Sequence, residues 1–179
     1  ISGQSYGFNL IHSPNEPDLE NALVDLYLRR RVNLVEASAF LALTPALVRY
    51  RTHGLSRDAE GRVVAPNRVI GKVSREEVAA KFFAPLPERF LRELVDAGHL
   101  SVEQAQMAAE IPLAQEVTVE TETGGNTHKR PALALFPTIQ AQRHASHEQY
   151  SYREPLRGGL GGGIATPSAA AAAFAKGAA

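Results

Sequence analysis

Short apolar runs alternate with amphipathic stretches along most of the chain. Runs at 6–12, 33–37, 69–73 and 117–121 have the length of buried strands, and stretches with helical spacing follow them. The first helix is predicted to use Asn15 as its cap and Pro17 in its first turn, with one buried face formed by Leu19, Ala22, Leu23 and Leu26. This alternation predicts an α/β fold with a parallel sheet, in which functional residues lie at the carboxyl ends of the strands.

Capping signals mark several further helices. Thr44-Pro45 opens a short helix that Gly54 closes, and Pro137 precedes a helix predicted over 138–148. The alanine-rich stretch 167–176 has excellent helix propensity and predicts the last helix. Two capping boxes are also predicted, in which each side chain satisfies the partner's backbone N–H: Ser74 with Glu77, and Ser101 with Gln104.

Two helices without a strand between them, at 87–97 and 101–110, have the pattern of an insertion, and Gly98 fits the end of the first. The predicted organisation is a single truncated domain, with the first βα units at 1–84, the helical insertion at 85–112 and later βα units at 113–179. We interpret both ends as truncations, because the chain opens without Met and stops after a helix, where another strand normally follows.

Composition narrows the classes of partner. The 19 Lys and Arg residues balance the 19 Asp and Glu residues, so bulk charge favours neither a nucleic acid nor an anionic membrane as partner. The absence of cysteine excludes disulfides and thiolate metal sites. No apolar run approaches the roughly 18 residues of a membrane span. We therefore expect a cytoplasmic protein that binds neither nucleic acid nor membrane.

A glycine-rich turn at 158–167 places bare backbone directly before a helix. Glycines allow close approach to an anion, and the free N–H groups at a helix start bind phosphate. A flexible loop without a ligand explains the same composition about equally well. No Gly-Lys-Ser or Gly-Lys-Thr follows, which argues against a Walker-type nucleotide loop.

Two further segments end apolar strands. Gly124-Gly125-Asn126-Thr127-His128 could bring backbone amides over a cofactor, although a surface turn with a solvated His128 is the simpler interpretation. Lys72 could point into the site and stabilise negative charge, or extend outward from the sheet rim. The acids and histidines are spaced too irregularly for a metal signature, so we predict no metal.

These residues together resemble a known family, the trans-acting enoyl reductases of polyunsaturated fatty acid and polyketide biosynthesis. That family belongs among the nitronate monooxygenase (2-nitropropane dioxygenase)-like barrels, which bind flavin mononucleotide (FMN). The resemblance runs in order through nearly the whole chain. Its segments are Gly7-Phe8-Asn9-Leu10-Ile11-His12-Ser13-Pro14-Asn15-Glu16-Pro17, Val35-Glu36-Ala37-Ser38-Ala39-Phe40, Val48-Arg49-Tyr50-Arg51, Ala65-Pro66-Asn67-Arg68, Lys72-Val73-Ser74-Arg75, Gly124-Gly125 and Gly162-Gly163-Ile164.

The resemblance implies an incomplete (β/α)8 TIM barrel with an inserted helical segment and bound FMN. It implies reduction of an enoyl thioester on an acyl carrier protein within a synthase complex, with NADPH or NADH as hydride donor. The helices at 85–110 would form a lid or acyl-binding subdomain. Carried over by residue, the implied cofactor-binding positions are Asn9, Lys72, Gly124, Gly125, Gly162, Gly163 and Ile164.

The chain departs from the family where a histidine is expected, because Asn126 stands there. An amide can donate a hydrogen bond but cannot transfer a proton, so Asn126 and His128, two residues on, are both kept as catalytic candidates. Two alternatives stay open. One is a nitronate monooxygenase, and the other is a catalytically degenerate barrel segment that binds flavin or a carrier protein.

Overall fold

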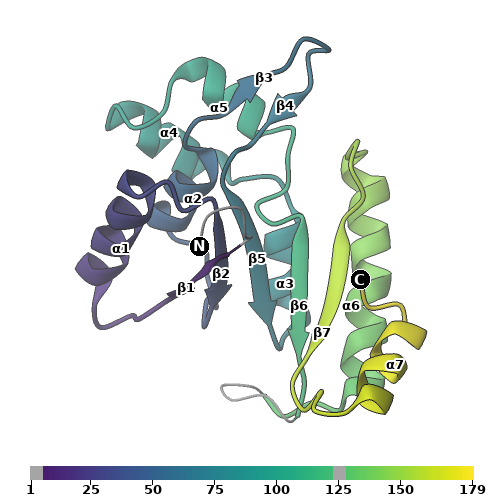
Figure 1. Ribbon diagram of the computed structural model, residues 1–179. Coiled ribbons are helices and arrows are strands. Elements are labelled where there is room, and N and C mark those ends of the chain that lie inside the picture. Colours follow the sequence, from purple (N-terminus) through teal and green to yellow (C-terminus); the bar gives the residue numbers. More distant parts are fainter. Residues whose placement is uncertain (1–5, 123–127) are drawn as a thin grey trace.

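A five-stranded parallel sheet organises the chain (Figure 1). The computed structural model describes residues 6–122 and 128–179. The strands are β1 (Phe8–Ile11), β2 (Leu34–Ser38), β5 (Arg68–Val73), β6 (Glu116–Glu120) and β7 (Arg157–Gly161), and their spatial order follows their sequence order. The predicted α/β fold with a parallel sheet is therefore confirmed.

A helix follows each parallel strand, and these helices cover one face of the sheet. They are α1 (Pro17–Arg29), α2 (Pro45–Thr52), α3 (Glu76–Phe83), α6 (Ala132–Tyr150) and α7 (Pro167–Ala175). Sequential parallel strands with right-handed crossovers place successive helices on the same side, and Figure 1 shows α3 and α6 behind the sheet. Every second strand residue faces this helical layer and is buried, as Val35, Val117 and Val119 are.

The opposite face of the sheet is polar. Asn9, Glu36, Lys72, Thr118 and Glu120 alternate with the buried residues of β1, β2, β5 and β6, and we call the surface they form the open face. Asn9 pairs in register with Glu36, and Lys72 pairs with Thr118. Strand alternation thus separates an apolar core on one side from charged side chains on the other.

The insertion consists of α4 (Glu88–Asp96) and α5 (Val102–Ala108), between α3 and β6. A bridge between Pro85 and Pro112 closes its base. Because α3 runs back toward the amino ends of the strands, the insertion lies at that end, near a small hairpin of β3 (Ser56–Arg57) and β4 (Val63–Val64) that the sequence did not predict (Figure 1). This end is opposite the carboxyl ends of the strands, and a lid or acyl-binding subdomain stays a prediction for the insertion.

The predicted start and buried face of α1 need correction. Glu16, not Asn15, is the N-cap, and its side chain makes no capping bond, although Pro17 occupies the first turn as predicted. Leu19 and Leu26 are exposed, whereas α1 buries Glu20, Val24 and Tyr27. The helix is rotated because Val24 and Tyr27 pack on the core while Glu20 bonds to polar groups beside it.

One capping box is confirmed and the other is wrong. Ser101 and Gln104 each accept from the other's backbone N–H, so the box that starts α5 is present. The N-cap of α3 is Arg75 without a side-chain bond, because the Ser74 hydroxyl binds a histidine across the sheet edge instead. Tertiary contacts here outweigh the local capping pattern.

The helix predicted over 138–148 is longer than expected. α6 runs from Ala132 to Tyr150 and contains Pro137 in its interior. Proline normally ends or kinks a helix because it lacks an N–H and crowds the preceding turn. Leu135, Phe136 and Ile139 on both sides of it are fully buried, so core packing sustains this helix through the proline.

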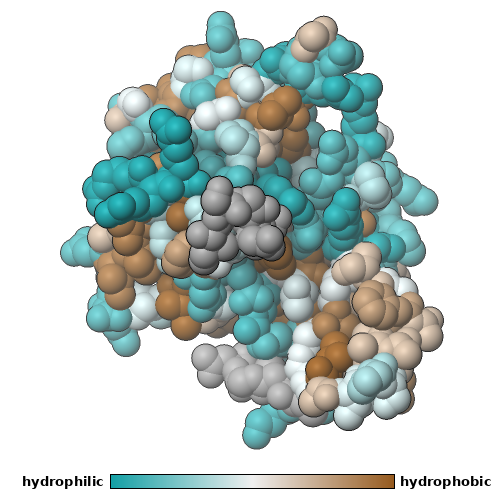
Figure 2. All heavy atoms as spheres, in the orientation of Figure 1, coloured by the Kyte–Doolittle hydropathy of each residue, from teal (hydrophilic) through white to brown (hydrophobic). Residues whose placement is uncertain are grey.

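β7 and α7 form although glycines weaken a strand. Gly158 and Gly159 pair with Val117 and Thr118 of β6, so the strand forms despite its glycines. α7 follows and carries an apolar surface, visible as tan and brown atoms in Figure 2. Phe174 is 68% exposed there, and Ile164, before the helix, is 40% exposed.

Candidate functional site

A pocket of about 320 Å³ opens at the carboxyl ends of β1, β2, β5 and β6. Small-molecule sites occupy roughly 300–1,000 Å³, so the pocket has the size of a modest ligand site. No described residue of the insertion contributes to it. Its lining residues are Asn9, Ile11, Ser38, Ala39, Phe40, Leu41, Lys72, Val73, Ser74, Arg75, Val78, Glu120 and His128.

Lys72 lies between two carboxylates on the open face. Its Nζ is 3.1 Å from Glu120 Oε1 and 3.9 Å from Glu36 Oε2, and all three side chains are partly buried. An ammonium group has three donors, and only the Glu120 contact is within hydrogen-bond reach. Lys72 therefore points along the open face into the pocket, and donors remain for a ligand.

Asn9 is held by its neighbours on two sides. The Ser38 hydroxyl donates to Asn9 Oδ1 at 2.7 Å, and the Tyr27 hydroxyl donates to the Asn9 carbonyl at 2.9 Å. Asn9 Oδ1 is engaged, and Nδ2 has no hydrogen-bond partner among residues 6–122 and 128–179, so its two donors can serve the pocket. The chain turns at once after Ser38, since Ala39 has a φ of 63° in the left-handed region.

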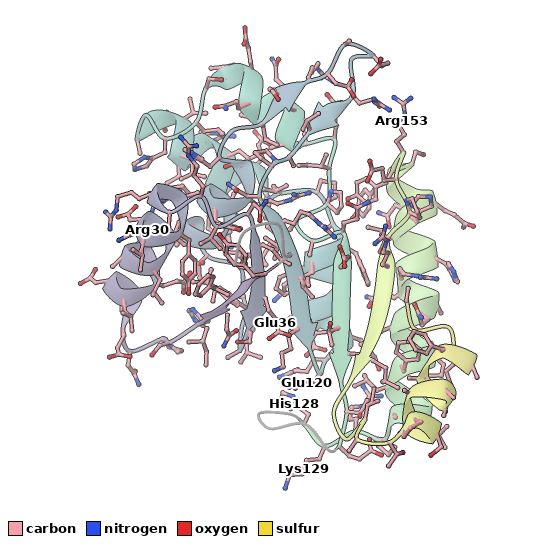
Figure 3. All side chains as sticks on the ribbon, viewed as in Figure 1. Arg30, Glu36, Glu120, His128, Lys129 and Arg153 are labelled. Carbon is pink, nitrogen blue, oxygen red and sulfur yellow. The ribbon has the colours of Figure 1, made fainter. Side chains whose placement is uncertain are left out.

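His128 joins the pocket from the segment after β6. Its Nδ1 is 2.9 Å from the Ser74 hydroxyl, which follows β5. Figure 3 shows Glu36, Glu120 and His128 together at the carboxyl ends of the strands, with Arg153 at the opposite end. His128 is exposed, so its proton can exchange with solvent. The predicted positions Gly124, Gly125 and Asn126 lie outside the described residues.

The rim of the pocket near α3 carries further charge. Arg75 pairs with Glu77, and Arg130 Nη1 lies 2.5 Å from Glu76 Oε1. The pKa of Glu77 is lowered, first by a hydrogen bond from its own backbone N–H and then by the Arg75 guanidinium. These pairs fasten the start of α3 beside the segment that carries His128.

The glycine-rich turn lies one strand away from the pocket. Gly162 and Gly163 follow β7 with φ values of 92° and 65°, a conformation that favours glycine. Thr166 then caps α7 by accepting from the Ala169 N–H at 3.2 Å. Gly161 pairs in register with Glu120, which links the turn to the pocket wall. Ile164 is exposed in the same turn and does not line the pocket.

The structure thus brings Asn9, Lys72 and His128 together, and sequence reasoning missed Glu36 and Glu120. The alternation of polar and apolar residues in their strands could have predicted both. Each stands next to apolar residues of its strand, in Val35-Glu36-Ala37 and at the end of Val117-Thr118-Val119-Glu120, where alternation places it opposite the core. Lys72 alternates in the same way, which predicts that the three charges share one face.

Comparison with known proteins assigns the family. The chain is 48% identical over 176 residues to a component of the polyunsaturated fatty acid synthase of Thraustochytrium, and 43% identical over 176 residues to "Polyketide biosynthesis protein PksE" of Bacillus subtilis. It superposes on the enoyl reductase domain of MlnA from Bacillus amyloliquefaciens with a TM-score of 0.91 and 38% identity. These similarities support the trans-acting enoyl reductase family.

The matches cover nearly all of this chain but only part of each relative. The match to the synthase component spans 97% of the chain but 12% of that relative, and the match to PksE spans 98% of the chain but 23% of that relative. The match to the MlnA domain spans 99% of the chain and 40% of that domain. No family model matches the chain. The resemblance noted in the sequence is confirmed by these matches.

The described residues contain neither a metal cluster nor a membrane span. Within 6–122 and 128–179, no group of three or more His, Asp or Glu side chains gathers as metal ligands do. Over the same ranges, no helix combines the length and the apolar character needed to cross a bilayer.

Proposed function

We propose that this chain forms part of an FMN-dependent enoyl reductase that reduces enoyl thioesters carried by an acyl carrier protein. The observation that carries the proposal is the match to the MlnA enoyl reductase domain over 99% of the chain. The relatives in polyunsaturated fatty acid and polyketide synthesis support a synthase complex as the partner. NADPH or NADH is the proposed hydride donor.

The strand order supports an incomplete (β/α)8 barrel as the wider fold. In such a barrel each new parallel strand is added beside the previous one, and the helices form one outer layer. The five strands here follow that rule, since β1, β2, β5, β6 and β7 are neighbours in sequence order. A doubly wound sheet instead reverses its strand order at a switch point.

The described residues fit a flavin on the open face. A Cβ built on Gly159 meets nothing closer than Thr118 Oγ1 at 3.5 Å, so the chain's own packing does not require glycine there. The missing side chain leaves bare strand surface beside Lys72 and Thr118, suited to a flat ring. Gly162, Gly163 and Ile164 lead into a capped helix start, whose N–H groups suit a phosphate.

Each residue then has a role that follows from its contacts. FMN supplies the transfer of a hydride from the nicotinamide to the β carbon of the alkene. Asn9 Nδ2 and the free donors of Lys72 face the pocket and can hold polar ring atoms. Glu36 and Glu120 orient the Lys72 ammonium. The α carbon needs a proton, and His128, held by Ser74, is the described group able to deliver one.

The test is expression of the full-length protein that contains this chain. We expect FMN-type absorbance in near-stoichiometric amount, and NADPH-dependent reduction of a crotonyl-type thioester. A colourless, folded protein that cannot be reconstituted with FMN contradicts the proposal. Oxidation of alkyl nitronates without enoyl reduction would instead identify a nitronate monooxygenase, and flavin binding without turnover a degenerate segment.

A further inference from the structure

A buried carboxylate lies behind the wall of the pocket, outside the groups used so far. Glu20 of α1 is 4% exposed, and both of its oxygens are bonded. Oε2 lies 2.8 Å from His12 Nδ1, and Oε1 accepts from the Thr44 hydroxyl. Few acidic side chains are buried this deeply in proteins unless partners satisfy them.

The partners of Glu20 belong to two different loops. His12 directly follows β1, and Thr44 is the N-cap of α2, which follows β2. One carboxylate therefore fastens the connection after β1 to the connection after β2 from the helical side. On the open face, the Ser38 to Asn9 bond joins the same two strand ends.

Phe40 lies between the bonds of Glu20 and the bond from Ser38 to Asn9. Its ring stacks on the His12 ring, with centroids 5.1 Å apart and planes inclined by 30°. The residue is 2% exposed, and it also lines the pocket beside Ser38 and Ala39. Glu20 orients His12, and His12 supports the rear of Phe40, so this contact chain sets the position of the pocket wall.

We propose that His12 and Glu20 are positioning residues that hold Phe40 as a rigid wall of the substrate pocket. The inference deepens the proposed function, because it assigns a shape-determining element to the same pocket. Neither residue lines the pocket, so both act through Phe40. A loosened wall weakens the positioning of the acyl thioester, and the effect falls on KM more than on kcat.

A second ion pair provides a matched control. Arg49 Nη1 lies 2.7 Å from Asp25 Oδ1 and also joins α1 to α2, and among the described residues neither side chain hydrogen-bonds to His12 or Phe40. Asp25→Asn neutralises this ion pair and leaves the Phe40 support intact. Glu20→Gln keeps the side-chain volume but removes the charge that orients His12. His12→Phe keeps a ring against Phe40 and removes the hydrogen bond.

The experiment uses the full-length protein and two readouts. We expect Glu20→Gln and His12→Phe to raise KM for the enoyl thioester about fivefold, as loss of a buried hydrogen bond would, with kcat within about twofold. Asp25→Asn should leave both constants unchanged. A KM unchanged in both variants, with only thermal stability reduced, overturns the proposal.

The second readout does not depend on activity. With 4-fluorophenylalanine incorporated, the resonance of Phe40, assigned with Phe40→Leu, should shift or broaden in Glu20→Gln but not in Asp25→Asn. An identical resonance in Glu20→Gln contradicts the positioning role even if the protein reduces thioesters. A changed resonance in a protein without enoyl reductase activity supports the positioning role and rejects the proposed substrate.

Discussion

Lys72 Nζ lies 3.1 Å from Glu120 Oε1, across two adjacent parallel strands of the open face. Glu36, from the strand on the other side, lies 3.9 Å from the same nitrogen. Two carboxylates beside one ammonium restrict its rotamers, which prepares its remaining donors for a ligand. The arrangement requires three strands in register. It gives the pocket an oriented ammonium group that can donate hydrogen bonds to a ligand.

Removing the Lys72 charge should impair the site more than the fold. Lys72→Met leaves Glu36 and Glu120 without their cation, and we expect weaker FMN binding and a rate lower by about 10²-fold, as for loss of one electrostatic contact in an active site. Arg92→Gln, which breaks an exposed pair with Glu88 on α4, is the control. Flavin titration and steady-state rates measure both. Equal FMN affinities and equal rates in the two variants would show that Lys72 does not belong to the proposed site.

Two glycines of the sheet should respond to alanine in opposite ways. Gly71→Ala places a Cβ 2.8 Å from the Phe82 ring, and the overpacking should destabilise the fold by about 1–3 kcal/mol. Gly159→Ala has room within the chain, so its stability should change little, while its FMN affinity should fall. Thermal unfolding of apoprotein and flavin titration separate the two effects. Unchanged FMN affinity in Gly159→Ala would count against a flavin over β7.

Replacing Asn126 tests whether the departure from the family pattern limits the rate. Asn126→His restores a group that can transfer a proton, and we expect a faster enoyl reduction at neutral pH. His128→Gln should slow the same reaction in the unsubstituted protein if His128 now delivers the proton. Stopped-flow traces of substrate reduction give both rates. No acceleration by histidine would place the proton donor elsewhere.

Stability should fall as pH is raised above about 10. Burial raises the pKa of Tyr27, Tyr50 and Tyr152 above the ordinary value of 10.0, so the unfolded chain loses these protons first and unfolding is favoured. Burial lowers the pKa of Arg51 to about 10, which acts in the opposite direction. The three phenols together lower the free energy of unfolding by more than the single guanidinium raises it. Thermal unfolding between pH 8 and 11 tests this, and a constant midpoint would contradict it.

Much of the fold was predictable because its signals are local. Four of the five strands and the two inserted helices follow from runs of apolar residues with periods of two and 3.6, whereas β7 is rich in glycine. Ser101 with Gln104 starts α5 as the capping rule requires. The family resemblance was also present in the ordered segments themselves, and the comparisons confirmed it. Of the site, Lys72 at the end of an apolar strand and His128 in the turn after another followed from the strand pattern, whereas Asn9 followed from the family resemblance.

The remaining features depend on contacts between distant segments. The Ser74 hydroxyl bonds to His128, 54 residues away, instead of capping α3 as predicted. α6 continues through Pro137 because buried side chains stabilise it. α1 turns Glu20 rather than Leu19 inward, since His12 and Thr44 satisfy that carboxylate.

The sequence by itself determined the alternation of strands and helices, the polar residues that end the strands and the family. Periodicity and capping depend on neighbours within a few residues, so the chain encodes them locally. Only the tertiary structure decided that Glu36 and Glu120 flank Lys72, and that Phe40 rests on His12. Strand register and helix rotation set these contacts, and both result from packing the whole sheet against its helices.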